Sequence, residues 1–246
     1  MTWSIIAHDR RSGRLGVAIA SRAFAVGATC VYVQPGIGAI SSQAYSNPYL
    51  ALNTLDALRA GQSARDALRA ALQADPGRAF RQVHLLTASG ECAYSTGQDC
   101  IGWAGDLRAP GVSVAGNMLS GPRVLEQSLQ TFLAHDECPL AERLLRALSA
   151  GEAAGGDKRG RQAARVVVFA GEPYHEIDLR VDDHPDPIAE LWRLYEVAHE
   201  GFMASRACTP TRDDPGGIYE HVARARHIEA FNEALGPVDF SRFWKR

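Results

Sequence analysis

The order of secondary-structure elements is the feature that most limits how this chain can fold. Runs of β-type residues come in hairpin-like groups, and pairs of amphipathic helices separate these groups. Strands are expected at residues 2–8, 14–21, 29–34, 38–43, 81–88, 91–95, 101–106, 111–114, 163–170 and 175–181. Helices are expected to begin at 48 and to run over 64–73, 123–135, 140–150, 185–203 and 218–235. This order disfavours Rossmann domains and TIM barrels, in which strands and helices alternate. It predicts the α+β class, with two antiparallel sheets packed face to face between helix pairs.

Composition and charge exclude several classes of protein. The 246 residues are 46% apolar and 22% charged, as in ordinary globular proteins. The net charge of -2 gives no general attraction for nucleic acid or anionic lipid. No apolar run approaches a membrane span of about 18 residues, and the first residues lack the pattern of a signal peptide. We therefore expect a cytoplasmic protein with no nucleic-acid or membrane partner, and reduced thiols for its five cysteines.

A linker rich in Pro, Asp and Gly at 209–217 suggests a boundary near the end of the chain. We expect one domain over residues 1–205 and a helical C-terminal extension over 206–246. The apolar helices expected at 186–203 and 218–235 offer a surface for self-association. On this basis the sequence predicts a homo-oligomer, most simply a dimer.

Thr2 is the first residue with a pattern that suggests catalysis. Threonine at position 2 is small enough that Met1 would normally be removed, which would leave an α-amine and a hydroxyl on one residue. An α-amine titrates at about 7.7–8.0, so part of it is a free base at neutral pH. Such an amine can activate its own hydroxyl, as in the N-terminal threonine variant of nucleophilic catalysis. Small residues at position 2 are also common without any function, but here Thr2 leads directly into a predicted strand.

The chain also resembles a known family. The residues that carry this resemblance are Met1-Thr2-Trp3-Ser4-Ile5-Ile6-Ala7, the segment 16–28 (GVAIASRAFAVGA), Ser42-Gln43-Ala44, the segment 115–119 (AGNML), the segment 155–162 (GGDKRGRQ) and the segment 178–187 (DLRVDDHPDP). In number and order they resemble the DUF1028 family over residues 1 to about 195. That family resembles the N-terminal nucleophile (Ntn) hydrolases, so the resemblance implies a four-layer αββα sandwich.

Ntn chemistry also needs an oxyanion hole and groups that hold the substrate. Asn117 follows a predicted strand, and its side-chain amide is a candidate oxyanion donor; a plain turn asparagine is an equally good interpretation. Ser21 and Arg22 end the second predicted strand and are expected near Thr2. Arg22 can lower the pKa of the amine or bind a carboxylate, although it is also interpretable as a surface arginine.

Three further residues complete the predicted site. The segment 155–160 is a polar, glycine-rich loop, in which Asp157 and Arg159 can orient the amine or hold substrate; an exposed charged turn is the alternative. Gln43 ends an apolar strand and either donates to substrate or satisfies local backbone groups. Together these residues predict catalytic roles for Thr2, Asn117 and Asp157. They predict substrate binding by Ser21, Arg22, Gln43 and Arg159.

The acidic and imidazole side chains at 182–186 allow two interpretations. Carboxylates and an imidazole at this spacing can hold a divalent metal. A helix start explains them better, with Asp183 or His184 near the cap, Pro185 in the first turn and Asp186 complementing the helix dipole. We therefore predict no metal and no cofactor. Isolated histidines such as His84 are interpreted as structural, and the segment 111–115 (GVSVA) is not a nucleophile elbow.

These observations predict an amidohydrolase that cleaves a small amide with Thr2 after removal of Met1. Arg22 and Arg159 suggest an anionic group on the substrate. Two alternatives stay open: a non-catalytic binding or assembly protein with the same shell, and a metal-dependent hydrolase that uses the cluster at 182–186.

Overall fold

The structure is a computed structural model, and it describes residues 2–235. The strands are β1 Thr2–Asp9, β2 Arg14–Ser21, β3 Val31–Gln34, β4 Gly38–Ala44, β5 Arg81–Thr87, β6 Cys92–Thr96, β7 Trp103–Ala109, β8 Val112–Leu119, β9 Ala163–Phe169 and β10 His175–Val181. The helices are α1 Val26–Thr29, α2 Pro48–Arg59, α3 Ala64–Ala74, the 3₁₀ turn η1 Arg78–Phe80, α4 Arg123–Ala134, α5 Leu140–Ala153, α6 Pro187–Val197, the π-helical turn η2 Ala198–Phe202, α7 Met203–Arg206 and α8 His221–Leu235.

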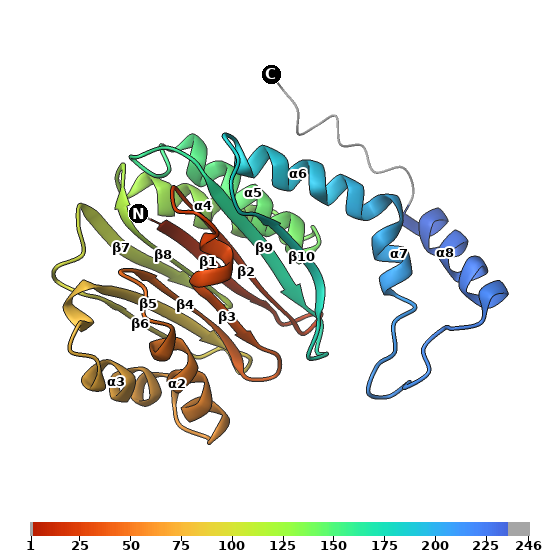
Figure 1. Cartoon of the computed structure of the whole chain (residues 1–246), viewed down its shortest axis with the longest axis horizontal. Coiled ribbons are helices and arrows are strands. Elements are labelled where there is room, and N and C mark those ends of the chain that lie inside the picture. Colours follow the sequence, from red (N-terminus) through yellow and green to blue (C-terminus); the bar gives the residue numbers. More distant parts are fainter. Residues whose placement is uncertain (1, 236–246) are drawn as a thin grey trace. The chain divides into compact units, whose positions relative to one another are not determined.

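The strands form two antiparallel sheets. The larger sheet has the order β10-β9-β2-β1-β8-β7, and the smaller has the order β3-β4-β5-β6. The sheets pack face to face, with β1 and β8 of the larger sheet against β4 and β5 of the smaller (Figure 1). The predicted α+β class is therefore confirmed, and so are the two antiparallel sheets.

Two helix pairs cover the outer faces of the sheets. Helices α4 and α5 lie on the larger sheet, and α2 and α3 lie on the smaller one, which completes an αββα order of layers (Figure 1). Between the smaller sheet and its helices, apolar side chains such as Ile40, Leu50 and Leu85 form a core. On the other side, Gly151 of α5 lies so close to Trp3 that a β-carbon there would come within 2.8 Å of the indole nitrogen. Burial of these side chains contributes about 1.5–3 kcal/mol each to folding.

The two inner faces of the sheets are polar at one end and apolar at the other. On β1, the alternating residues Thr2, Ser4 and Ile6 point between the sheets; Ser4 hydrogen-bonds to the smaller sheet, and Ile6 belongs to an apolar cluster there. The polar end coincides with the start of β1. This gradient places buried hydrogen-bonding groups around Thr2.

Several predicted elements differ from the observed ones. Residues 24–28 were expected as a loop, but Val26–Thr29 form the short helix α1. Strand β8 continues to Leu119, beyond the expected end at 114, so Asn117 lies within a strand rather than in a turn. The reason is pairing with residues 2–7 of β1, which overrides the turn preference of Gly-Asn. The long helix expected over 185–203 begins at Pro187 and passes into a π-helical turn at 198.

The chain divides into two compact units, residues 1–191 and 192–246. In the described part of the second unit, α7 and α8 are joined by a segment in which residues 210–216 are exposed. The predicted boundary between residues 205 and 206 stays a prediction. Within residues 2–235, no helix is both long and apolar enough to span a bilayer.

Candidate active site

Thr2, Ser21 and Asn117 meet at one end of the larger sheet. Strand β1 begins with Thr2, and the antiparallel neighbours β2 and β8 end beside it. The Thr2 hydroxyl donates a hydrogen bond to Ser21 Oγ at 3.2 Å. On the other side Thr2 is the direct cross-strand partner of Asn117, so both side chains project from the same face of the sheet. All three residues are buried.

The amide of Asn117 is held by Gln82 of the smaller sheet, which is itself bonded to Gln43. Asn117 Nδ2 donates to Gln82 Oε1 at 3.0 Å, and Gln43 Nε2 donates to the same oxygen at 2.8 Å. The Gln82 amide nitrogen in turn donates to the Gly116 carbonyl at 2.8 Å. These bonds fix the orientation of all three amides. Gln43 is fully buried and contacts protein groups, and a contact with substrate stays a prediction for this residue.

A second buried network lies deeper between the sheets. Ser4 donates to Gln43 Oε1 at 2.7 Å, so His84 Nε2–H must donate to Ser4 Oγ, 2.7 Å away. His84 Nδ1 then accepts from the Ser113 hydroxyl at 2.9 Å. Complete burial lowers the pKa of His84 to about 3, which keeps the imidazole neutral. The interpretation of His84 as a structural histidine agrees with these contacts.

Asp157 organises the loop that faces the end of β1 and β2. Its side chain is 1% exposed and accepts from the backbone N–H groups of Arg22 and Arg159, both at 2.8 Å. It also forms an ion pair with the Arg159 guanidinium at 3.2 Å. The Arg22 guanidinium donates to the Arg159 carbonyl. A β-bridge between Leu119 and Asp157 attaches this loop to the end of β8, close to Asn117.

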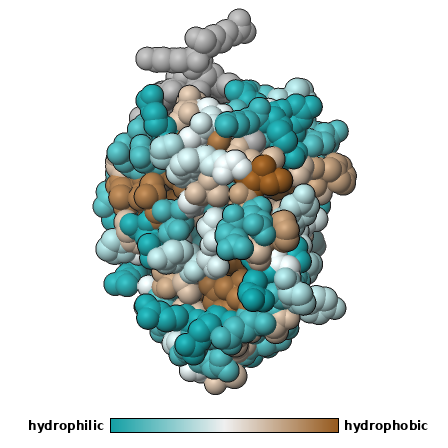
Figure 2. Space-filling model, turned by 90° about the vertical axis from the view of Figure 1, so that its left-hand side faces the viewer, coloured by the Kyte–Doolittle hydropathy of each residue, from teal (hydrophilic) through white to brown (hydrophobic). Residues whose placement is uncertain are grey.

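A pocket of about 210 Å³ opens beside Asn117. Most of its walls are apolar, and the lining residues are Ala44, Tyr45, Phe80, Cys100, Ile101, Asn117, Met118 and Arg159. The end of the molecule at which β1 starts carries separate hydrophobic groups among hydrophilic ones (Figure 2). Thr2 does not line the pocket, but its strand partner Asn117 does. Burial, together with the neighbouring charge of Asp99, raises the pKa of the Cys100 thiol, so this lining group is neutral at physiological pH.

Two lining residues have a strained backbone. Ala44 (φ 68°) and Met118 (φ 52°) adopt the left-handed conformation. For a residue with a β-carbon this conformation is about 1–2 kcal/mol less stable than the right-handed one. Each follows directly after one of the polar residues described above, Gln43 and Asn117. Strain of this kind is retained where the surroundings impose it, and it is concentrated at functional sites.

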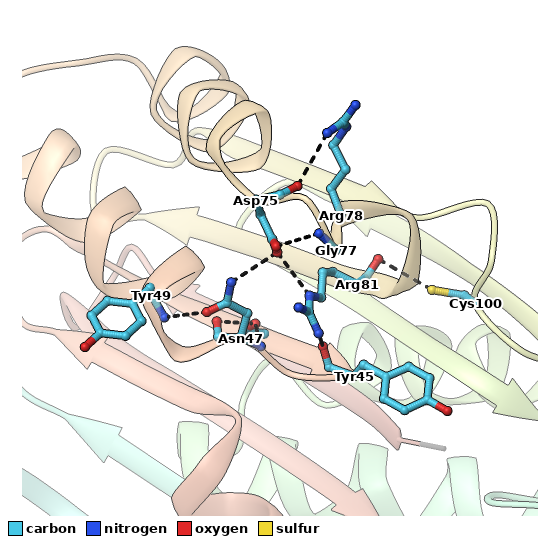
Figure 3. Close-up of polar contacts among 9 residues, drawn as sticks. Tyr45, Asn47, Tyr49, Asp75, Gly77, Arg78, Arg81 and Cys100 are labelled. Atoms are coloured by element: carbon cyan, nitrogen blue, oxygen red, sulfur yellow. Dashed lines mark hydrogen bonds and ion pairs between the residues drawn. The ribbon is translucent and has the colours of Figure 1, made fainter.

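A buried ionic network supports the wall of the pocket (Figure 3). Asp75, at the end of α3, accepts from Arg81 Nε at 3.0 Å and from Asn47 Nδ2 at 3.1 Å. Arg81 also donates to the Tyr45 carbonyl at 2.6 Å. Burial disfavours the charged carboxylate, but these hydrogen bonds and that from the Gly77 amide outweigh the burial, so the pKa of Asp75 lies below its usual value.

The acidic segment 182–186 serves as a turn and a helix start. Asp186 accepts from the Ala189 amide at 3.2 Å and pairs with Arg161 at 2.7 Å, while Asp182 pairs with Arg180. The helix begins at Pro187, so Asp186 is the capping residue, and neither Asp183 nor His184 is. Among residues 2–235 no group of three His, Cys, Asp or Glu side chains could hold a metal ion. All five cysteines are free thiols.

The structure therefore brings every predicted site residue to one end of the two sheets. Sequence reasoning missed Gln82, which holds the Asn117 amide, and the pocket wall of Tyr45, Phe80 and Ile101. A signal for Gln82 was available: Gln82 and His84 alternate with the apolar residues Val83 and Leu85, which places two polar side chains on one face of the strand. The wall residues come from separate loops, and their sequences contain no pattern that joins them.

Comparison with known proteins identifies the family. A family described as of unknown function, DUF1028, matches residues 2–191. The crystal structure of protein SPO2555 from Silicibacter pomeroyi, also described as DUF1028, is 32% identical, with a TM-score of 0.81 over 89% of this chain and 99% of that one. Anbu (ancestral beta-subunit) from Yersinia bercovieri is 12% identical, with a TM-score of 0.37 over 85% of this chain and 98% of that one. An Anbu (Gly-1) mutant from Hyphomicrobium sp. strain MC1 is 13% identical, with a TM-score of 0.40 over 81% of this chain and 95% of that one. A search of curated proteins finds no match. The family match and the similarity to SPO2555 together establish that this chain belongs to the DUF1028 family.

Proposed function

We propose that this protein hydrolyses a small amide, with Thr2 as an N-terminal nucleophile after removal of Met1. The observation that carries the proposal is that the Thr2 hydroxyl is hydrogen-bonded to Ser21 and that Thr2 pairs across the strands with Asn117, which lines a pocket. The four layers also agree with the αββα sandwich that the resemblance to Ntn hydrolases implies.

Removal of Met1 converts the Thr2 amide nitrogen into an amine that can accept the hydroxyl proton. Thr2 Oγ1 then attacks the amide carbon, the C–N bond breaks, and the amine delivers the proton to the leaving nitrogen. Water hydrolyses the resulting ester and releases the acid. Ser21 positions the Thr2 hydroxyl through their hydrogen bond.

Asn117 is the proposed oxyanion donor. Its amide is oriented by Gln82 and lines the pocket, so a substrate carbonyl in the pocket would lie next to a fixed N–H group. Loss of one oxyanion donor typically reduces kcat by about 10²–10³-fold. Gln43 and Gln82 are proposed as positioning residues for this amide.

Asp157 is proposed to act by positioning Arg22 and Arg159 rather than by proton transfer. The hydrogen bonds and the ion pair of its side chain are with Arg22 and Arg159. The Arg159 guanidinium pairs with Asp157, and the Arg22 guanidinium donates to the Arg159 carbonyl, so these contacts hold two cations and one carboxylate, an excess of one positive charge. That excess agrees with a substrate that carries an anionic group.

The test compares chains that begin at Thr2 with chains that retain Met1. Processed protein is expected to hydrolyse members of an amide library, whereas Thr2→Ala and Met1-retaining chains lose activity by 10³-fold or more, an order of magnitude typical for a lost nucleophile. Thr2→Ser should keep part of the activity because it retains the hydroxyl. Undiminished activity of Thr2→Ala would reject the mechanism and favour the alternative of a binding protein.

The predictions of a homodimer and of a cytoplasmic location are separate from this mechanism. Sedimentation equilibrium of the purified chain tests the first. Fractionation of the source cells tests the second.

A further inference from the structure

We infer that the pocket beside Asn117 binds the amine side of an N-acylated hydrophobic amino acid, by its apolar side chain and its α-carboxylate. This inference deepens the proposed function and rests on it. The reaction would convert an N-acyl amino acid and water into a carboxylic acid and a free amino acid.

The apolar part of the pocket is suited to a flat hydrophobic group. Tyr45 and Phe80 lie edge to face with ring centroids 6.0 Å apart, and Ile101 and Met118 complete the lining. Three large hydrophobic side chains of the lining are exposed to solvent: Tyr45 (59%), Phe80 (45%) and Ile101 (54%). Exposed apolar side chains that gather in one place are typical of a binding site. A ligand that fills the pocket would remove this surface from water. The aromatic edges also favour an aromatic ring as the ligand.

The wall is rigid before any ligand binds. Arg81 donates to the Tyr45 carbonyl and is itself held by buried Asp75, and the Cys100 thiol donates to the Arg81 carbonyl at 3.5 Å (Figure 3). The Tyr45 amide donates to the Phe80 carbonyl at 3.3 Å. Together with the strained backbone at Ala44 and Met118, these contacts indicate a preformed site, which lowers the entropic cost of binding.

Arg159 supplies the recognition of the carboxylate. Arg159 lines the pocket together with the aromatic residues, and its guanidinium is oriented by Asp157, through Nε at 3.4 Å and Nη2 at 3.2 Å. A guanidinium has five N–H donors in a planar fork, a geometry that matches carboxylates. Among residues 2–235 no acidic residue lines the pocket itself, and the nearby carboxylate of Asp157 is paired with Arg159.

In this binding mode the scissile amide lies at Asn117, which lines the same pocket as Arg159 and Phe80. The α-carbon of an N-acyl amino acid carries the carboxylate, the side chain and the amide nitrogen. With the carboxylate on Arg159 and the side chain against Phe80, the third substituent points towards Asn117 and its strand partner Thr2. Attack by Thr2 Oγ1 forms an ester to the acyl group, and the C–N bond breaks to release the amino acid with the proton. Water then cleaves the ester.

The experiment uses processed full-length protein and three substrates: N-acetyl-L-phenylalanine, its C-terminal amide, and N-acetyl-L-alanine. We expect kcat/KM to be about 10–100-fold higher for the first than for its amide, as is typical for a charge-assisted pair. Arg159→Met should abolish this preference, mainly through KM, while the neighbouring Lys158→Gln preserves it. Phe80→Ala should reduce the preference for phenylalanine over alanine by about 10-fold.

Calorimetry measures the binding of N-acetyl-L-phenylalanine to the Thr2→Ala chain. It tests the ligand class of the pocket separately from hydrolysis by Thr2. Hydrolysis that depends on Thr2 but not on the carboxylate or Arg159 would overturn this inference and leave the proposed function intact. Binding that depends on Arg159 without any hydrolysis by processed protein would overturn the proposed function and keep the ligand class. Neither binding nor hydrolysis would overturn both.

Discussion

At the scale of single residues, the buried polar groups between the two sheets make the stability of the protein depend on pH. His84 is the clearest case, because its imidazole is fully enclosed between Ser4 and Ser113. A protonated imidazole there would have to break the bond in which Nδ1 accepts from Ser113. In the folded protein the imidazole of His84 therefore stays neutral at pH values at which the same imidazole is protonated in the unfolded chain.

The first prediction concerns this proton. The pKa of His84 is about 3 in the folded chain against 6.5 for an ordinary histidine. Between these values the unfolded state binds more protons, so the free energy of unfolding falls as pH is lowered from about 6.5 towards 3. One such group contributes a slope of up to about 1.4 kcal/mol per pH unit. Urea unfolding at several pH values measures the slope, and His84→Gln, which can still bridge the two serines, should reduce it. An unchanged slope in that variant would contradict the assignment.

Asp75 gives a second prediction at this scale. Its depressed pKa means that its contribution to stability is complete above the unfolded value of 3.8 and is lost as pH falls through the lower folded value. Asp75→Asn should lower the free energy of unfolding by about 2 kcal/mol at neutral pH, because hydrogen bonds to a charged group are lost. The exposed pair of Asp56 with Arg59 is the control, and Asp56→Asn should cost less than about 0.5 kcal/mol. Equal effects of the two substitutions would show that the Asp75 network is not stabilising.

At the scale of elements, the connections between strands hold the pocket wall in place through backbone contacts. The turn after β6 packs directly on η1, which carries Phe80. Gly97 donates to the Arg81 carbonyl at 2.8 Å, and a β-carbon at Gly97 would lie 2.2 Å from the Ala79 carbonyl oxygen. The atoms nearest to the added β-carbon belong to the backbone, so the clash cannot be relieved by rotation of a side chain.

Gly97→Ala is therefore expected to displace the turn from η1. The predicted cost is about 1–3 kcal/mol, as for other overpacked sites, with a weaker pocket as a second effect. Thermal unfolding measures the first effect, and KM for the amide substrate measures the second. Gly121→Ala is the matched control, because nothing lies within 4 Å of the β-carbon it would add. A Gly97→Ala chain as stable as this control would contradict the packing argument.

At the scale of the whole molecule, the division into residues 1–191 and 192–246 separates the candidate site from the C-terminal helices. Every residue of the site lies in the first unit. The glycine-rich loop with Asp157 is tied down by the pairs of Arg159 with Asp157 and of Arg161 with Glu152. Residues 210–216 are all exposed, and so are Lys158, Arg159 and Arg161, but Arg159 and Arg161 carry these ion pairs.

Limited proteolysis with trypsin should therefore cut first after Arg212 and not within the loop 158–161. Cleavage needs a segment that can open locally, and exposed segments open at the lowest cost. Mass spectrometry of the early fragments identifies the cut, and the fragment 1–212 should retain the activity of the intact chain. A first cut after Lys158, Arg159 or Arg161 would show that the contacts of Asp157 do not fix this loop.

The α+β class with two antiparallel sheets could be predicted from the amino-acid sequence alone, whereas the functions of the site residues stay predictions. Hairpin-like groups of strands between helix pairs are local patterns, and the inference from them needs only the periodicities of strands and helices. Thr2 stood out for a chemical reason, its position next to the first residue. The resemblance to DUF1028 led to Asn117, Asp157, Arg22 and Arg159 as further candidate site residues.

How these residues are combined depends on packing between segments that are far apart in the sequence. Asn117 was expected in a turn, but pairing with β1 keeps it in a strand opposite Thr2, and Gln82 from the other sheet orients its amide. The pocket wall joins Tyr45, Phe80 and Ile101 from three connections. Contacts of this kind depend on the register and packing of strands far apart in the sequence. The physical reason is that periodicity determines which face a side chain occupies, whereas its neighbours across the interface depend on how the two sheets pack.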